Sequence, residues 1–391
     1  MHLLIRSVAV GISLAAAVLA QSTHPVSGGG NALLAALQAA APGDIFDVLP
    51  GNYFATATSR GARIELRPGA VLATQFGSLL AGLTVTNLPV DEAVVVVGGR
   101  IDGFSFTDCA GAIVVDRAIV DATWAASSAT NCTGPISLQD VSTPLTLAYG
   151  TLTITDCSQF SAHRAALART TSTNSNLALA ASTIFPYGGA WPPGQSPSLR
   201  IVGGSVFLTG GLVRGGMAAS WPFLEPAIRI ESGELVVTGA AVLQESSPNV
   251  PTSPAIDGVG GAVRIDPSVT LLGTPPIAGP ATVTVATTPG LAVARSTGAA
   301  GYDVTATVEP SSLVFTLLAL PTAPQNSPFG TLWLRPDALI LDFGVADPQG
   351  RRVFTRSLAA VPPYLALTLQ SASLSPTGTV AVGAPLRFVW D

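Results

Sequence analysis

The amino-acid sequence predicts an all-β protein in which short strands stack as a solenoid. All three cysteines end the same local phrase, Thr-Asx-Cys, at Cys109, Cys132 and Cys157, and the intervals of 23 and 25 residues between them mark an internal repeat. A repeat of this size is typical of solenoids, because one unit buries its apolar face only against its neighbour. The 40 glycines and 31 prolines favour short strands and tight turns over helices.

The first twenty residues have the layout of a cleavable secretory signal. Arg6 precedes an apolar or small run from Val8 to Ala20, and Gln21 follows a plausible cleavage site. This run is shorter than the ~20 residues that span a bilayer, although a membrane anchor is the alternative interpretation. We expect residues 1–20 to be removed, no membrane span in the mature chain, and a secreted, cell-surface or periplasmic location.

The charged residues exclude several kinds of chemistry. All 18 basic residues are arginine, so a lysine base or a Schiff base is impossible. Only His24 and His163 follow the signal, which makes a histidine-rich metal site improbable, and we expect no metal and no cofactor. The net charge of −5 argues against nucleic acid as a partner, since phosphates require a basic surface.

Residues 31–41 form the one convincing helix, with Asn31 as N-cap and Pro42-Gly43 at its end. An alternating strand and the phrase Pro50-Gly51-Asn52-Tyr53 follow directly. This arrangement resembles the start of right-handed parallel β-helix proteins of the pectate-lyase-like superfamily. The resemblance implies that residues 21–275 form such a β-helix and that the helix caps its open end.

A second repeat runs through the later half of the chain. Leu199-Arg200-Ile201 matches Ile228-Arg229-Ile230, and Val263-Arg264-Ile265 follows more loosely. The arginines are 29 and 35 residues apart, which exceeds the cysteine period, so the excess is expected to leave the coil as loops. These loops span residues 185–197, 217–226 and 246–254. Each lies just before the Arg strand of its repeat, which predicts a binding face on one side.

The loops and the Arg strands that follow them contain the predicted ligand-binding residues. Flat aromatic rings stack on sugar rings, whereas charged side chains near them donate or accept hydrogen bonds. The aromatic candidates are Phe185, Tyr187, Trp191, Trp221 and Phe223, and the polar candidates are Glu225, Arg200 and Arg229. The alternative is that the loops fold back as hydrophobic plugs and that Arg200, Arg229 and Arg264 form a solvated ladder.

A linker-like stretch at residues 274–280 ends the repeat, and residues 276–391 are predicted to form a small β-sandwich. The expected strands cover residues 281–286, 302–308, 313–319, 330–334, 351–357, 365–370 and 386–390. Residues 330–388 resemble a C-terminal module of secreted proteins from planctomycete-type bacteria. That resemblance implies no known activity.

The cysteines and carboxylates are the remaining candidates for chemistry. We expect Cys109, Cys132 and Cys157 to form an inward column of free thiols; one disulfide with one free thiol, or a metal-binding or catalytic thiol, are the alternatives. Asp116, Asp140 and the pair His163-Arg164 follow the three cysteines at similar distances and are the catalytic candidates. The alternative is that they are turn residues on a solvated edge.

The catalytic motifs of the resembled enzymes are missing. The chain lacks the Asn-Thr-Asp, Asp-Asp, Gly-His-Gly and Arg-Ile-Lys motifs of polygalacturonase-like enzymes and the Trp-Ile-Asp-His motif of pectate lyases. Our leading hypothesis is a non-catalytic, extracytoplasmic bacterial protein that holds extracellular polysaccharide or cell-envelope components on its loop face. The alternatives are a polysaccharide lyase or glycoside hydrolase, and a structural or adhesive envelope protein.

Overall fold

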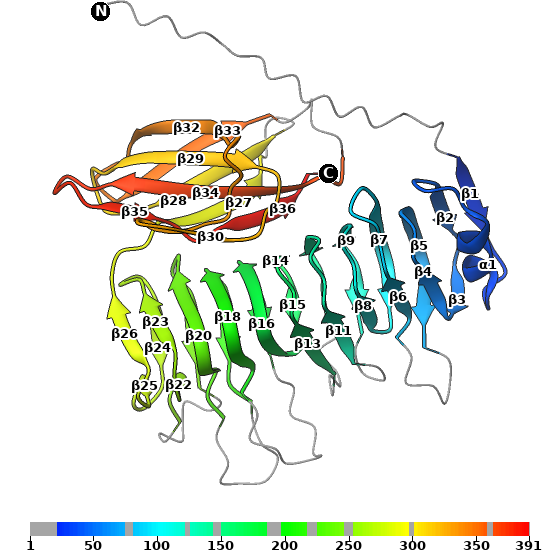
Figure 1. Ribbon diagram of the computed structural model, residues 1–391, viewed down its shortest axis with the longest axis horizontal. Helices are drawn as coiled ribbons and strands as arrows, with labels where there is room; N and C mark the ends of the chain where they lie inside the picture. Colours follow the sequence, from blue (N-terminus) through cyan, green and yellow to red (C-terminus); the bar gives the residue numbers. More distant parts are fainter. Residues whose placement is uncertain are drawn as a thin grey trace, which may run out of the picture.

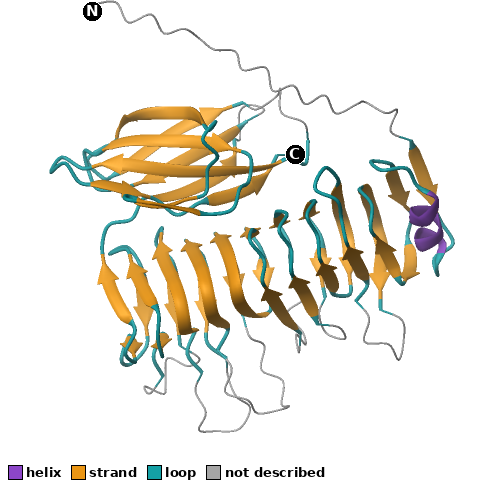
Figure 2. Cartoon of the chain, viewed as in Figure 1, coloured by secondary structure: helices purple, strands orange, loops and turns teal. Residues whose placement is uncertain are grey.

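The computed structural model describes residues 22–74, 81–121, 126–143, 150–185, 197–216, 225–245, 253–296, 301–357 and 363–390. The chain forms a right-handed parallel β-helix with an N-terminal capping helix, followed by a small antiparallel β-sandwich (Figure 1). Strands dominate both parts, and the described residues contain a single α-helix (Figure 2). The predicted fold class is therefore confirmed.

The helix α1 (Ala32–Ala39) covers the first coil of the β-helix, and its buried residues Leu33 and Leu37 pack against the core. Asn31 occupies the N-cap position, as expected, but its side chain makes no capping hydrogen bond. The helix ends at Ala40, where the backbone is extended, two residues before Pro42. Within the described residues, no helix has the length and apolarity needed to cross a bilayer.

Each complete coil of the β-helix passes through three parallel sheets, which we call the open sheet, the covered sheet and the third sheet. The open sheet contains β4 (Thr56–Thr58), β6 (Leu83–Thr86), β8 (Phe104–Thr107), β11 (Ser127–Thr130), β13 (Thr151–Thr155), the first parts of β16 (Arg169–Ala180), β18 (Leu199–Thr209) and β20 (Ile228–Thr238), then β22 (Ile256–Gly258) and β25 (Ile277–Ala278).

The covered sheet follows in each coil, and the third sheet completes it. The covered sheet contains β1 (Thr23–Val26), β2 (Ile45–Val48), the first parts of β5 (Ala62–Ala73) and β7 (Ala93–Ile101), β9 (Ala112–Asp116), β12 (Ile136–Gln139), β14 (Phe160–His163), the last parts of β16, β18 and β20, then β23 (Ala262–Ile265) and β26 (Thr282–Val285). The third sheet contains β3 (Gly51–Phe54), the last parts of β5 and β7, β10 (Ile119–Val120), β15 (Ala166–Leu167), β17 (Thr183–Ile184), β19 (Leu212–Arg214), β21 (Val242–Gln244) and β24 (Thr270–Leu272).

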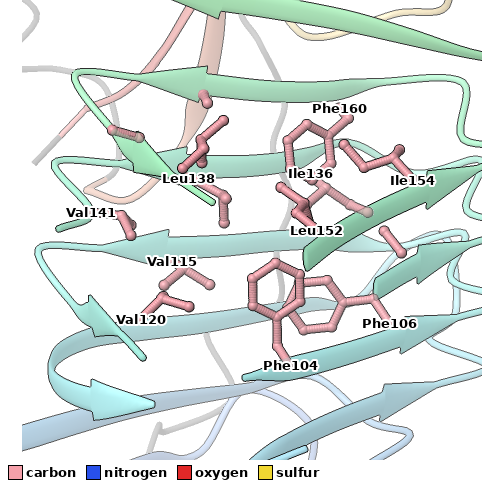
Figure 3. Packing of buried hydrophobic residues seen from close by; sticks show 14 of the residues in the cluster. Phe104, Phe106, Val115, Val120, Ile136, Leu138, Val141, Leu152, Ile154 and Phe160 are labelled. Carbon is pink, nitrogen blue, oxygen red and sulfur yellow. The ribbon is translucent and has the colours of Figure 1, made fainter. Parts of the chain in front are cut away.

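The core of the β-helix is filled by alternate residues of most strands, because successive side chains of a strand point to opposite faces. On the open sheet, Val85, Phe106 and Ile154 point inward and are fully buried. The rings of Phe104 and Phe106 stack with centroids 4.5 Å apart, and Figure 3 shows them in the same interior as Phe160. The alternation leaves the remaining residues of each strand to face outward.

The Thr-Asx-Cys phrase marks the turn from the open sheet to the covered sheet. Its middle residues Asp108, Asn131 and Asp156 adopt left-handed conformations with φ of 54°, 54° and 52°. Asp and Asn tolerate this conformation better than most non-glycine residues. The cysteine that follows turns inward, and all three cysteines are buried and free. The predicted column of unpaired thiols is confirmed.

The β-sandwich consists of two main antiparallel sheets and a small hairpin. One sheet contains β27 (Gly290–Arg295), β28 (Tyr302–Thr307) and β33 (Arg351–Arg356); the other contains β32 (Leu339–Val345), β29 (Leu313–Ala319), β34 (Ala366–Leu374), β35 (Val380–Val382) and β36 (Leu386–Val389); β30 (Gln325–Ser327) and β31 (Gly330–Leu332) form the hairpin. The strand expected at residues 281–286 forms as β26, but it pairs in parallel with β23 and so belongs to the β-helix. Its alternating pattern is compatible with both kinds of sheet.

The sandwich folds back along the β-helix and packs on the outer face of the covered sheet (Figure 1). Gln139 of β12 donates a hydrogen bond from Nε2 to the carbonyl of Val389 at 2.9 Å and accepts one from the Val389 amide. The buried Arg387 of β36 donates to Oε1 of Gln159 at 3.1 Å. Phe207 contacts the edge of the Trp333 ring, with centroids 5.6 Å apart. Both polar and apolar contacts therefore hold the two parts together.

Candidate functional site

The strand register separates the predicted catalytic residues into two columns. Asp116 pairs with Gln139, and Gln139 pairs with His163, so these three form one outward column of the covered sheet. Asp140 and Arg164 each lie one residue later, in the left-handed turn that leaves this sheet. Asp116 and Asp140 therefore occupy different columns, consistent with their intervals of seven and eight residues from the preceding cysteines.

The sandwich lies over this region of the covered sheet. The side chain of Asp116 has no solvent exposure and pairs with Arg117, whose Nε lies 2.7 Å from Oδ2 of Asp116. Arg117 also donates from Nη2 to the hydroxyl of Tyr364, at 3.3 Å. Asp140 accepts two hydrogen bonds from Arg164, at 2.7 and 2.6 Å. Each of the two carboxylates thus already has a guanidinium partner within the protein.

His163 is buried between the β-helix and the sandwich, with 2% of its surface exposed. Burial and, to a smaller extent, the positive charge of Arg164 lower the pKa of its imidazole to about 4, although Asp140 acts in the opposite direction. Among the described residues, no hydrogen bond of regular geometry reaches either ring nitrogen, and the nearby backbone of Val293 raises the pKa only slightly. The side chain is therefore a neutral, enclosed imidazole at neutral pH, which suits packing better than proton transfer to a substrate.

The first two arginines of the repeat lie side by side in a column on the open sheet, as predicted. Arg200 pairs with Arg229, and the next residue of the column is Asp257. Arg264 does not continue it, since it pairs with Val236 in the covered sheet. The coil that contains Arg264 places β22 in the open sheet, so the Val263-Arg264-Ile265 strand occupies the following sheet.

Carboxylates hold the arginines of this column in place. Arg200 donates to both carboxylate oxygens of Glu231, at 2.9 and 3.1 Å, and this hydrogen bonding lowers the pKa of Glu231. Arg229 lies 3.4 Å from Glu231 and 3.6 Å from Asp257. The two arginine side chains remain 45% and 37% exposed. Each guanidinium thus keeps hydrogen-bond donors that face solvent.

The three long connections lead into the open sheet, next to the arginine column. They join β17 to β18, β19 to β20 and β21 to β22. Tyr187, Trp191, Trp221 and Phe223 lie outside the described residues. Phe185 is half-buried at the start of the first connection. Glu225, at the end of the second, is buried and accepts a hydrogen bond from Arg169 at 3.1 Å, so it anchors the connection to β16.

The N-terminal half of the open sheet presents hydroxyl groups that sequence reasoning missed as a site. We call this set the threonine array. Its members face outward in two columns, Thr84, Ser105, Ser128, Thr153 and Thr171 beside Thr86, Thr107, Thr130, Thr155 and Thr173. The sequence signal was present, since a threonine precedes the Asx-Cys pair in every copy of the phrase.

The described residues contain no group of three or more His, Cys, Asp or Glu side chains arranged to hold a metal ion. The cysteine column offers no accessible thiolate either, because all three side chains are buried. Hydrogen bonding to Cys132 and burial raise the pKa of Cys109, whereas hydrogen bonding to Cys132 lowers that of Cys157. The column is best described as an interior packing element.

Comparison of this chain with family models and with curated proteins found no match. The geometry of the open sheet is thus the basis for a functional assignment.

Proposed function

We propose that this chain is a secreted or surface-exposed, non-catalytic β-helix protein that binds extracellular polysaccharide at the C-terminal half of its open sheet. In this proposal the β-helix belongs to the pectate-lyase-like superfamily, and the C-terminal sandwich corresponds to the module of planctomycete-type bacterial proteins. The sandwich acts as a brace, because it occupies the covered sheet and leaves the open sheet free for a ligand.

The observation that carries the proposal is the exposed arginine column beside the three long connections. Arg200 and Arg229 are held by Glu231 and Asp257 and yet remain partly exposed, so a ligand can contact them at little further entropic cost. Guanidinium groups in such an arrangement bind sugar hydroxyls and uronate carboxylates through charge-assisted hydrogen bonds. The three connections that lead into this part of the sheet contain aromatic residues in their sequence, and aromatic rings suit the apolar faces of sugar rings.

The surroundings of the carboxylates favour binding over catalysis. Glycoside hydrolysis requires two carboxyl groups that flank a substrate. Asp116 is enclosed beneath the sandwich, and Asp140 is held by two hydrogen bonds from Arg164. A lyase or hydrolase that used these groups would have to displace the sandwich and break the ion pairs before a sugar chain reached them.

A glycan array screened with the protein lacking residues 1–20 tests the proposal, followed by titration of each glycan that binds. We expect Arg200→Ala and Arg229→Ala each to weaken binding about tenfold, since a hydrogen bond to a charged group contributes about 1.5–3 kcal/mol. Arg67→Ala is the matched control. Arg67 makes the same two-point contact with Asp47, at 2.6 and 3.1 Å, but lies near the N-terminal end of the β-helix.

Three outcomes would contradict the proposal. The first is the absence of binding to any glycan, which favours a structural or adhesive protein. The second is equal loss of binding in Arg67→Ala and the two open-sheet variants. The third is the release of new reducing ends or unsaturated sugars from a bound glycan, which establishes an enzyme.

A further inference from the structure

We propose that the threonine array is an ice-binding face that holds an ordered layer of water on the N-terminal half of the open sheet. The array lies on β6, β8, β11, β13 and β16, whereas the arginine column lies on β18 and β20. The two sites are on different coils of one sheet, so this inference does not rest on the polysaccharide proposal.

The spacing of the array is set by the backbone and is regular in two directions. Thr107, Thr130 and Thr155 occupy successive coils in parallel register, and neighbouring strands of a sheet lie ~4.8 Å apart. Thr153 and Thr155 are two residues apart on one strand, which corresponds to ~6.6 Å. The two steps resemble the repeats of hexagonal ice along its a and c axes. Water molecules bound to successive hydroxyls therefore fall near positions of the ice lattice.

The side chains of the array are suited to hold such a layer. Threonine is β-branched and has few χ1 rotamers, so its hydroxyl and methyl groups recur in nearly the same place on each coil. Among the described contacts, the only side-chain hydrogen bond within the array joins Ser128 to Ser105, at 3.4 Å. The threonine hydroxyls of the array have no protein partner among the described residues and are left to bond with water.

None of the ten side chains of the array is charged. This absence of charge helps to distinguish between the ligands that the array could bind. An ionised group orients water around itself and disturbs a lattice, whereas methyl and hydroxyl groups fit between lattice positions. Neutral sugar chains are recognised mainly by aromatic stacking, and none of the ten array residues is aromatic. The chemistry of the array thus fits crystalline water better than a polysaccharide.

The interior beneath the array keeps it rigid. The inward residues Val85, Phe106 and Ile154 are fully buried between the array positions. At one edge, the left-handed turns at Asp108, Asn131 and Asp156 hold successive strands in register, and Asn131 donates from Nδ2 to Oδ1 of Asp108. Rigidity is required because a surface that matches a lattice loses its fit when neighbouring strands shift.

Partition of the protein into a slowly growing ice hemisphere tests the inference, together with inhibition of ice recrystallisation. We expect the wild-type protein to concentrate in the ice and the variants Thr130→Tyr and Thr155→Tyr to be excluded like a non-binding protein. A tyrosine ring in the array breaks the regular surface without entering the core. Thr284→Tyr is the control, since Thr284 is an exposed strand residue on β26, outside the array.

Exclusion of the wild-type protein from ice would overturn the inference, as would equal retention of the wild-type and array variants. Retention on crystalline chitin or cellulose without any effect on ice would also overturn it and assign the array to a neutral polysaccharide. Circular dichroism of each variant verifies that the β-helix is intact. If Thr130→Tyr does not fold, Thr130→Val replaces it: it keeps the shape, removes the hydroxyl, and is expected to reduce retention in ice.

Discussion

The open sheet and the covered sheet belong to the same coils but have different outward residues. On the open sheet, outward positions of β11 and β13 are half-buried or exposed threonine and serine. On the covered sheet, the outward residues Val114, Ser161, Phe207 and Val236 are all buried by the sandwich. The inward residues of both sheets belong to the same apolar core and therefore determine the fold of the coil. The outward residues differ between the two sheets, and they determine whether the sandwich covers a sheet or leaves it to solvent.

This difference changes how polar residues on a β-helix are interpreted. Asp116 and His163, two of the predicted catalytic residues, form a polar column with Gln139, and this column lies beneath the sandwich. Gln139 bonds both polar groups of the Val389 peptide backbone and so contributes to docking. Ligand binding is therefore expected on the open sheet, where no part of the described chain competes for the surface.

The largest effect is expected from a charge placed under the sandwich. Ser161→Lys puts an unpaired ammonium group at a buried outward position of the covered sheet, at a cost of about 4 kcal/mol or more. We expect the sandwich to detach, with a larger radius of gyration in small-angle X-ray scattering. Thr153→Lys, at an outward position of the neighbouring open-sheet strand, should change stability by less than ~0.5 kcal/mol. A compact Ser161→Lys protein would contradict the assigned interface.

A smaller loss is expected when an aromatic side chain is removed from the interface. Phe207→Ala removes the ring that meets Trp333 and should lower the free energy of unfolding by about 3 kcal/mol. Val202→Ala, on the open-sheet part of the same strand, should cost less than ~1 kcal/mol because Val202 is only half-buried. Chemical denaturation of both variants measures the difference, and equal losses would mean that the interface contributes little.

The local parts of this architecture were predictable, whereas the contact between its two parts was not. The cysteine period and the match of Arg200 with Arg229 follow from side chains that recur on adjacent coils. The docked sandwich joins residues that are 250 positions apart, such as Gln139 and Val389, and no local pattern records such a contact. Which of the polar residues after each cysteine share a column was also left open, because the interval from the cysteine to the end of the next strand varies between coils.

The third prediction concerns pH. The pKa of buried His163 is about 4, compared with 6.5 for an unburied imidazole, so the unfolded chain binds more protons between these values. The contribution of this residue to the free energy of unfolding is complete above pH 6.5 and is lost as the pH falls towards 4, by about 3 kcal/mol in total.

Thermal unfolding from pH 7 to 4 should show a shallower decline in stability for His163→Gln than for the wild type. His24→Gln controls for the loss of a histidine, and unchanged pH dependence in His163→Gln would contradict the enclosed imidazole.

The smallest effect compares turns of two adjacent coils. Asp156 lies between the open and covered sheets with φ of 52°, and Ala181 lies between the covered and third sheets with φ of 48°. Alanine pays a steric cost of about 1 kcal/mol in this conformation, whereas glycine does not. Asp156→Ala should therefore be less stable than Asp156→Gly by about 1 kcal/mol, and Ala181→Gly should be more stable than the wild type by a similar amount.

The denaturation midpoints of these variants measure both differences in stability. A stabilised Asp156→Ala would show that the aspartate is kept at this turn for a reason other than its left-handed backbone, such as contact with a ligand at the edge of the threonine array.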